Sequence, residues 1–473
     1  MTAIAGVEYT GLTALRGPLA FIDAVPGLAF HDQVELTVAD GTTRAGRVLG
    51  VSDRAAVIEI FGATDGLTLG STRLRFLGSP LRLGVGRELL GRTFDGMGRP
   101  RDGLPPPLVV EERPIEGAVI NPCRREYPRE FLETGVSAID LLTSVVLGQK
   151  LPIFTEAGLP HDALAMQIVR QARAPGVEGF ALVFAALGLP RPVALRYEEM
   201  FRGSGALGRM VAFINVADDS AAERLITPRC ALTAAEYLAF DCGMHVLVIL
   251  HDITNYGESL REVSSARGEV PSRKGYPGYL YSDLASIFER AGRIKGRPGS
   301  LTMMPIVTMP SGDVTHPIPD LTGYVTEGQI ILDRALDRRG VYPPIAVLPS
   351  LSRLMSDGIG AGRTREDHED VARQLYAACA RVERARSLAA IIGGDELSED
   401  ERRYLRFGDV FEAAFLKQDA SEARSIEDTL SRAWRLFADV PPADLTRLPS
   451  ELIERYLPRG GAASPSRAME VAR

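Results

Sequence analysis

The sequence is poor in cysteine. Its 473 residues include only four, which stand far apart and show no CxxC spacing: Cys123, Cys230, Cys242 and Cys379. This pattern indicates neither a disulfide framework nor a cysteine zinc site. The chain therefore fits a reducing cytoplasm, and we expect no metal site and no tightly bound cofactor in it.

Long apolar runs and basic runs are also missing. No stretch of about 18 apolar residues occurs, and the N-terminus lacks a basic region followed by an apolar one. We therefore expect neither a membrane span nor a signal peptide, and any membrane association would depend on partner proteins. The formal net charge is -7, and no run of Lys and Arg offsets it. Such a surface does not attract a phosphate backbone, so nucleic acid is not expected as a partner.

What the sequence does contain is a succession of different patterns, and its length suggests about three domains. In residues 1–76, apolar and polar residues alternate over 33–38, and Asp40-Gly41 then supplies a hairpin turn. Short strands at this spacing predict a small N-terminal β-barrel. A connector rich in Gly and Pro follows at residues 84–107, where unusual backbone angles are needed.

Residues 77–358 alternate apolar strands with helical segments, which is typical of a parallel α/β sheet. The expected strands are 151–154, 179–185, 210–215, 245–250, 301–307 and 345–348. Residues 359–459 lose the strands, and acidic residues after Thr364 and Ser425 predict helix starts there, so a C-terminal helical bundle is expected. The tail, 460–473, is rich in Gly, Ala and Ser, and this composition predicts disorder.

The first strand of the sheet leads into a loop that departs from a phosphate-binding one. A P-loop cradles phosphates with a glycine-rich turn, followed by a Lys for the β and γ phosphates and a Ser or Thr for magnesium. Here the glycine is Gly158, the Lys position is Leu159, and the Ser/Thr position is Pro160, which also lacks a backbone donor. Glu156 adds a carboxylate where phosphate oxygens would lie. We therefore predict a degenerate P-loop that does not bind triphosphate in the usual way.

Two further positions bear on catalysis. Asp252 follows the apolar strand 245–250 and resembles a Walker B magnesium ligand, although an aspartate at such a place more often caps a helix or turn. Water activation also needs a carboxylate after a neighbouring strand. The strand 179–185 is followed only by Ala186-Leu187-Gly188, so no general base is expected there.

Long motifs in the second half of the chain resemble the B subunits of V/A-type ATPases. They are GYPGY at residues 275–279, DVTHPIPDLTGYVTEGQI at 313–330 and YPPIAVLPSLSRL at 342–354. Residues 151–161 and 231–237 are similar to the same family, and the likeness extends from the barrel to about Pro458. Motifs of this length are far more specific than a lone glycine pattern.

The resemblance implies a multidomain α/β protein with an N-terminal β-barrel, a RecA-like nucleotide-binding domain and a helical C-terminal domain. Three such chains would alternate with three catalytic A subunits in a hexamer that also binds central and peripheral stalk subunits. The family's B subunit lacks the catalytic lysine and glutamate, so the chain would be a regulatory, non-catalytic subunit. The complex would couple ATP synthesis or hydrolysis to proton or sodium transport, with this chain cytoplasmic and peripheral to the cell membrane.

The resemblance also implies a site at the interface between the A and B subunits. Arg353 lies on a turn that in this family projects into the neighbouring A subunit's ATP site, where it would act as an arginine finger. ATP or ADP with magnesium would bind there, with Ser352 and Tyr324 beside it. Gly158 and Asp252 would remain as parts of a nucleotide site of the chain's own.

Three alternatives stay open. A catalytic member of a related hexameric class would need a GxxxxGK[ST] loop, which the chain lacks. A Rho-like RNA translocase would need a basic and aromatic surface on the barrel, which instead carries many carboxylates. A pure scaffold, in which the arginine is idle, can be separated from a regulatory subunit only by a mutant.

Overall fold

The computed structural model describes residues 8–203 and 205–458, so the tail predicted to be disordered, 460–473, lies outside the described residues. The chain forms two compact units, each assembled from separate stretches of sequence. Unit 1 consists of Met1–Arg124, Ala181–Val307 and Val314–Val325. Unit 2 consists of Arg125–Phe180, Thr308–Asp313 and Thr326–Arg473. Among the described residues, no helix combines the length and the apolar character that crossing a bilayer requires.

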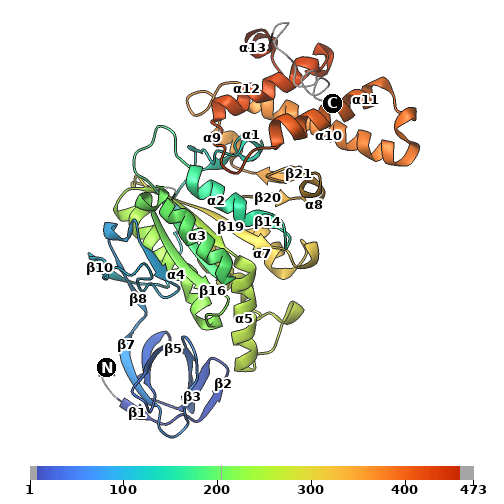
Figure 1. Cartoon of the computed structure of the whole chain (residues 1–473). Coiled ribbons are helices and arrows are strands. Elements are labelled where there is room, and N and C mark those ends of the chain that lie inside the picture. Colours follow the sequence, from blue (N-terminus) through green and yellow to red (C-terminus); the bar gives the residue numbers. More distant parts are fainter. Residues whose placement is uncertain (1–7, 204, 459–473) are drawn as a thin grey trace. The chain divides into compact units, whose positions relative to one another are not determined.

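The N-terminal sheet of unit 1 is a half-barrel, as the alternating pattern predicts. Its strands are β1 (Glu8–Thr10), β2 (Ala14–Arg16), β3 (Leu19–Asp23), β4 (Asp32–Thr37), β5 (Thr43–Val51), β6 (Ala55–Ile60) and β7 (Arg73–Pro80). They pair in the antiparallel order β1-β7-β4-β5-β6-β3-β2, and the sheet curls on itself (Figure 1). In β4, Val34 and Leu36 are fully buried while Gln33 and Glu35 are half-buried, because alternate side chains point to opposite faces. The inward side chains form one apolar core.

The rest of unit 1 is an α/β layer. β19 (Ser300–Thr308), β17 (His245–His251), β15 (Phe180–Leu189), β16 (Met210–Val216) and β9 (Thr93–Asp95) lie side by side in that order. β17 runs parallel to β19, and β16 runs parallel to both β15 and β9. Every residue of β16 and β17 is buried, as expected of strands covered on both faces. The fold class predicted from the sequence is confirmed.

Helices and short strands complete unit 1. They are β8 (Arg82–Val85), β10 (Glu111–Pro114), β18 (Gly292–Ile294), α3 (Arg191–Gly203), α4 (Ala221–Glu236), α5 (Ile253–Arg267), α6 (Leu280–Phe288) and α7 (Pro317–Val325). α4 packs against α5, β16 and β17. The predicted connector at residues 84–107 contains a strand that was not expected. The three residues of β9 pair with β16 as an added edge strand. They lie between turns at Gly91 and Gly98, which both have positive φ.

A chain of ion pairs joins the half-barrel to helices of the same unit. Arg47 of β5 donates to Glu59 of β6 at 2.7 Å and to Glu116, in the segment after β10, at 3.1 Å. Glu116 also accepts from Arg229 of α4 at 2.8 Å, and Arg229 donates to Asp283 of α6 at 2.9 Å. The Arg47 and Glu59 side chains are 8% and 0% exposed. These groups therefore depend on one another for their solvation.

Unit 2 contains a second set of strands. Its elements up to residue 358 are β11 (Arg125–Glu126), β12 (Phe131–Leu132), α1 (Ser137–Leu142), β13 (Val145–Val146), β14 (Ile153–Thr155), α2 (His161–Gln171), β20 (Gly328–Leu332), α8 (Arg334–Arg338), β21 (Ile345–Ser352) and α9 (Met355–Gly358). β14 runs parallel to β20, but β21 is antiparallel to β20. The prediction that 345–348 belongs to a parallel sheet was therefore wrong for this strand. The short α8 and the turn at Pro343-Pro344 reverse the chain direction between the two strands.

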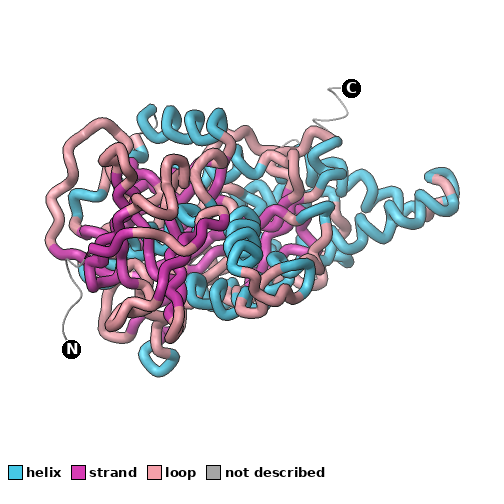
Figure 2. Tube along the Cα trace, turned by 90° about the horizontal axis from the view of Figure 1, so that it is seen from below, coloured by secondary structure: helices cyan, strands magenta, loops and turns pink. Residues whose placement is uncertain are grey.

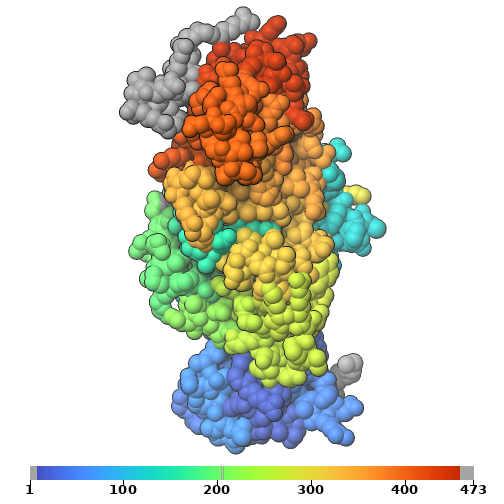
Figure 3. Space-filling model, turned by 90° about the vertical axis from the view of Figure 1, so that its right-hand side faces the viewer, coloured from blue at the N-terminus to red at the C-terminus, as the bar shows by residue number. Residues whose placement is uncertain are grey.

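The C-terminal part of unit 2 is helical, as predicted. It comprises α10 (His368–Ile392), α11 (Glu399–Val410), α12 (Ile426–Leu436) and α13 (Ser450–Tyr456). Figure 2 shows these helices in cyan, and Figure 3 shows their surface in orange and red. Ser425 caps α12 by accepting from the backbone N–H of Asp428 at 3.2 Å, but the N-cap of α10 is Asp367, three residues later than the predicted Thr364. The Thr364 hydroxyl instead accepts from the Gly360 N–H at 2.8 Å and closes a turn before the helix.

Candidate functional site

Two backbone donors of the loop between β14 and α2 are engaged within the loop itself. Gly158 has a φ of +85° and open space around its Cα, so backbone angle rather than packing calls for glycine there. The N–H of Leu159 donates to the Glu156 carbonyl at 3.2 Å, and the N–H of His161 donates to the Leu159 carbonyl at 2.9 Å. In a phosphate-binding loop such donors point at the ligand. Here they close the loop on itself.

The side chain of Glu156 is bound by a cation of the same unit. Arg334, the first residue of α8, donates from Nε to Glu156 Oε2 at 2.8 Å and from Nη2 to the Ala157 carbonyl at 2.7 Å. Both side chains are about one-third exposed, at 32% for Glu156 and 37% for Arg334. The loop therefore already holds an anion and its counter-ion, and the Glu156 carboxylate would repel a phosphate placed beside it.

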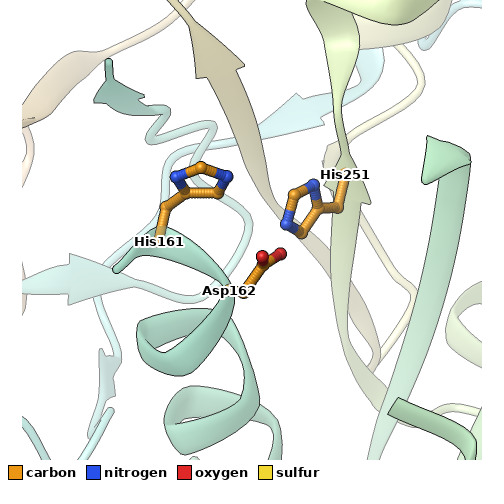
Figure 4. Close-up of side chains that lie close together, drawn as sticks. All are labelled: His161, Asp162 and His251. Atoms are coloured by element: carbon orange, nitrogen blue, oxygen red, sulfur yellow. The ribbon is translucent and has the colours of Figure 1, made fainter. Parts of the chain in front are cut away.

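The two positions that carry the Lys and the magnesium hydroxyl in a P-loop have no polar group to offer. Leu159 is 4% exposed and packs inward, and Pro160 stands immediately before α2 without a side-chain cap. The first turn of α2 carries His161 and Asp162 (Figure 4). His161 Nδ1 lies 3.2 Å from Thr155 Oγ1, and Asp162 places negative charge at the helix N-terminus. Neither residue replaces a phosphate-binding lysine.

Asp252 lies at the end of β17 in unit 1. It is the N-cap of α5, and its Oδ1 accepts from the backbone N–H of Thr254 at 2.9 Å. The preceding residue, His251 (labelled in Figure 4), is buried. Its ring meets the rings of Phe184 and Tyr197 edge-on. Asp252 thus has the helix-capping role that an aspartate in this position most often has.

The neighbouring strand offers no general base. β15 runs to Leu189, four residues beyond the predicted end at Ala185, and contains no Asp or Glu. Near its end the backbone N–H of Gly188 donates to Asn215 of β16 at 3.0 Å. An amide side chain cannot take a proton from water at neutral pH, so neither β15 nor Asn215 supplies a general base at this strand end.

Arg353 is an exposed residue immediately after β21. Its backbone N–H donates to the Glu327 carbonyl at 2.9 Å, and its Nη1 donates to the Thr326 carbonyl at 3.4 Å. Among the described residues, no carboxylate lies within ion-pair distance of its guanidinium. Most of the guanidinium donors are therefore available to a ligand from outside.

Strand β21 runs to Ser352, beyond the end predicted at residue 348, so the turn that carries Arg353 begins later than expected. Ser350 and Ser352 belong to β21, because Ser352 pairs with Gly328 of β20, and only Arg353 begins the turn. The Ser352 hydroxyl is buried, donates to the Ser144 carbonyl at 2.8 Å and accepts from Gln149 Nε2 at 2.9 Å. Ser352 therefore orders the strand end beside Arg353, with its hydroxyl engaged within unit 2.

Tyr324, the other residue expected at the interface, lies in the last turn of α7 in unit 1. Its side chain is 74% exposed. Residues that sequence reasoning missed are those that hold the Arg353 backbone in place. Glu327, whose carbonyl accepts from the Arg353 N–H, forms an ion pair with Lys150 at 3.0 Å. Glu327 stands within one of the quoted motifs, but nothing in the sequence indicates its partner.

Two protein-family models match the chain. Residues 135–352 match the nucleotide-binding domain of the ATP synthase alpha/beta family, and residues 357–457 match the C-terminal domain of V and A type ATP synthase. The parallel strands from β14 onward, the loop after β14 and the C-terminal helices fall within these matched regions, whereas β9 precedes them. The fold and the site thus define the ATP synthase alpha/beta class.

Comparison with individual proteins identifies the type of subunit within this class. The V-type ATP synthase beta chain of Thermotoga neapolitana is 54% identical over 449 residues, which cover 95% of this chain and 98% of the relative. The B subunit of the A-type ATP synthase of Aeropyrum pernix is 53% identical over 453 residues, covering 96% and 98%. A solved structure, the ATP synthase subunit NeqB from Nanoarcheaum equitans, has a TM-score of 0.71 and 36% identity, covering 90% of this chain and 100% of that one. The chain belongs to the B (beta) subunits of V/A-type ATP synthases, and this membership implies other subunits as partners.

Proposed function

We propose that the chain is a non-catalytic, regulatory B subunit that supplies Arg353 in trans to an ATP site on the catalytic A subunit. The observation that carries this proposal is the exposed guanidinium of Arg353, anchored through its backbone at residues 326–327 and without a carboxylate partner among the described residues. The loop after β14 supports the non-catalytic role, since Glu156 and Arg334 already pair there. A subunit that presents an exposed arginine and lacks a usual phosphate-binding loop is suited to form one side of a nucleotide site on a neighbouring subunit.

The chemistry of phosphoryl transfer explains why an arginine is suited to this role. Negative charge spreads over the γ-phosphate oxygens in the transition state, and a guanidinium meets those oxygens with a planar fork of donors. Lysine offers only a point charge. ATP or ADP with magnesium would be held by the A subunit, with Tyr324 contributing from this chain's side of the interface.

The assembly that follows is an alternating ring of three A and three B subunits with central and peripheral stalks. The chain would lie in the cytoplasm as part of the head, peripheral to the cell membrane. ATP synthesis or hydrolysis on the A subunits would be coupled to proton or sodium transport through the membrane part of the complex. The chain itself would turn over no ATP.

The test is Arg353→Ala in a complex reconstituted with the cognate A subunit. We expect turnover to fall on the order of 10³-fold, by comparison with other arginine fingers. The apparent ATP affinity should change much less, because the finger acts mainly in the transition state. Arg353→Lys should recover only part of the rate, since lysine lacks the fork.

A matched control is Arg338→Ala, which removes another exposed arginine from unit 2. Native mass spectrometry of each complex shows whether the ring assembles with unchanged composition. An Arg353→Ala complex that assembles normally and retains turnover within about threefold of wild type, far inside the loss a finger should cause, would leave only the idle-scaffold role.

A further inference from the structure

Glu327 is bound to Lys150 through both its side chain and its backbone. Glu327 Oε1 lies 3.0 Å from Lys150 Nζ, and Oε2 accepts from the Lys150 backbone N–H at 2.7 Å. The Glu327 N–H donates in turn to the Lys150 carbonyl at 3.0 Å. The Lys150 side chain is 5% exposed and that of Glu327 is 31% exposed. Contacts of this kind hold a backbone in one place more firmly than a surface ion pair does.

The backbone that this pair holds is the one to which Arg353 is attached. The Glu327 carbonyl accepts from the Arg353 N–H at 2.9 Å and from Gln149 Nε2 at 3.2 Å. Gln149 Nε2 also donates to the Ser352 hydroxyl at 2.9 Å, next to Arg353 in sequence. Residues 149–150 therefore support both sides of the strand end from which the arginine extends.

Lys150 has no other evident use in nucleotide chemistry. It precedes β14, whereas the loop corresponding to a P-loop follows that strand. Its ammonium is nearly inaccessible and is bound to Glu327. A lysine in this position cannot serve as the missing phosphate lysine, which leaves a role within the chain itself.

We propose that Glu327 and Lys150 form a positioning pair for Arg353, acting on the arginine through the backbone at residues 326–327. This inference rests on the proposed function of Arg353. An arginine that must meet transition-state oxygens requires placement to within about 0.5 Å, and a displacement of about 1 Å can reduce a rate by roughly 100-fold. Removing the charge of Glu327 weakens its interaction with Lys150, so the backbone at residues 326–327 is held less firmly, while the Arg353 guanidinium itself is retained.

The experiment uses Glu327→Gln in the assembled complex with the A subunit. We expect turnover to fall roughly tenfold, which is less than the loss caused by a fully displaced catalytic group. The KM for ATP should change less than about twofold, because the arginine does not contribute to substrate binding in the ground state. The same substitution in an Arg353→Ala complex causes no further loss, since the residue it positions is gone. A purely structural role for Glu327 would reduce the rate by the same factor in both backgrounds, and that result would overturn the proposal.

The outcomes separate this proposal from the one on which it rests. If Arg353→Ala alone leaves turnover unchanged, the arginine finger fails and the positioning role fails with it. If Arg353→Ala abolishes turnover but Glu327→Gln has no effect, or has equal effects with and without Arg353, only the positioning role fails.

A matched control exists in the same unit. Glu422 pairs with Arg424 at 2.8 Å, and their side chains are 33% and 4% exposed, close to the values for Glu327 and Lys150. Glu422→Gln should therefore reproduce the cost to stability without the loss of turnover. The double variant Lys150→Gln with Glu327→Gln leaves no uncompensated buried charge, so it replaces the single variant if that one does not assemble. It should show the same dependence on Arg353.

Discussion

Glu156 Oε2 lies 2.8 Å from Nε of Arg334, so the loop that follows β14 carries its own anion and cation. We expect the isolated chain to bind Mg-ATP only weakly, with no saturable binding at concentrations below about 1 mM. The cause is the combination of the Glu156 carboxylate with the apolar Leu159 and Pro160. Titration calorimetry measures this directly.

Variants of the loop sharpen that prediction. Glu156→Gln should improve binding slightly by removing repulsion, whereas Arg334→Ala should not, since it leaves the carboxylate without its cation. Magnesium-dependent binding should appear only in a triple variant that combines Leu159→Lys, Pro160→Thr and Glu156→Gly. Tight magnesium-dependent binding by the wild-type chain would show that the loop accommodates phosphate in spite of the carboxylate.

The second prediction concerns pH and His368. This side chain is fully buried, with Nε2 3.1 Å from the Leu141 carbonyl and Nδ1 3.0 Å from Thr364 Oγ1. Burial lowers the pKa of His368 from its usual 6.5 to about 4. Between about pH 6.5 and pH 4, this histidine is therefore protonated in the unfolded chain but not in the folded chain. The free energy of unfolding consequently decreases as the pH falls from about 6.5 toward 4. The loss is on the order of 3 kcal/mol.

His368→Gln isolates this effect, because glutamine can still donate to the Leu141 carbonyl and does not titrate. The urea unfolding of wild type and variant should be followed by the fluorescence of Trp434, the only tryptophan, whose indole donates to Asp367. The stability difference between them should shrink as the pH is lowered from about 7 to 4. A difference that does not vary with pH would contradict the assigned cause.

The third prediction concerns the buried pair of the half-barrel. Arg47→Met leaves Glu59, which is fully buried, without its cation, and should cost about 3–5 kcal/mol in unfolding free energy. The control is Arg191→Met, whose pair with Asp218 is 63% and 69% exposed and should contribute at most about 1 kcal/mol. Circular dichroism during urea unfolding gives both values. Equal, small losses would mean that water reaches Glu59.

The fourth prediction concerns Tyr324, which is 74% exposed in the last turn of α7. If its ring contacts nucleotide at the interface, Tyr324→Ala should raise the KM for ATP several-fold, while Tyr324→Phe keeps the ring and stays near wild type. The stability of the free chain should change by no more than about 0.5 kcal/mol, as for other surface substitutions. Tyr281→Ala on α6, at 50% exposure, is the control. Equal effects of the two alanine variants would remove the specific role of Tyr324.

Local patterns in the sequence predicted much of this molecule correctly. The alternation around Val34 predicted the half-barrel, and the apolar run before Asp252 predicted both a buried strand and a helix cap. These features depend on neighbours within a few residues, so periodicity and capping residues reveal them. The start of α10 and the end of β21 were less well predicted, because Thr364 and Ser350 form hydrogen bonds that depend on the tertiary fold.

The contacts of the candidate site could not be predicted in the same way. Glu156 and Arg334 are 178 residues apart in sequence, and Lys150 and Glu327 are 177 apart. Each pair forms because β14 and β20 run parallel, which brings the flanking residues together. A single sequence carries no periodic signal for such a pairing. The role of Arg353 was expected from the family resemblance, whereas its anchoring required the structure.

The chain of ion pairs from Arg47 through Glu116 to Arg229 has a mechanical consequence. It ties β5 of the half-barrel to α4, and through Asp283 to α6, with directional bonds that resist shear. Sliding of the half-barrel against these helices would have to break several charge-assisted bonds at once. A displacement of β5 relative to α4 and α6 is therefore opposed by these bonds in addition to the apolar packing within unit 1.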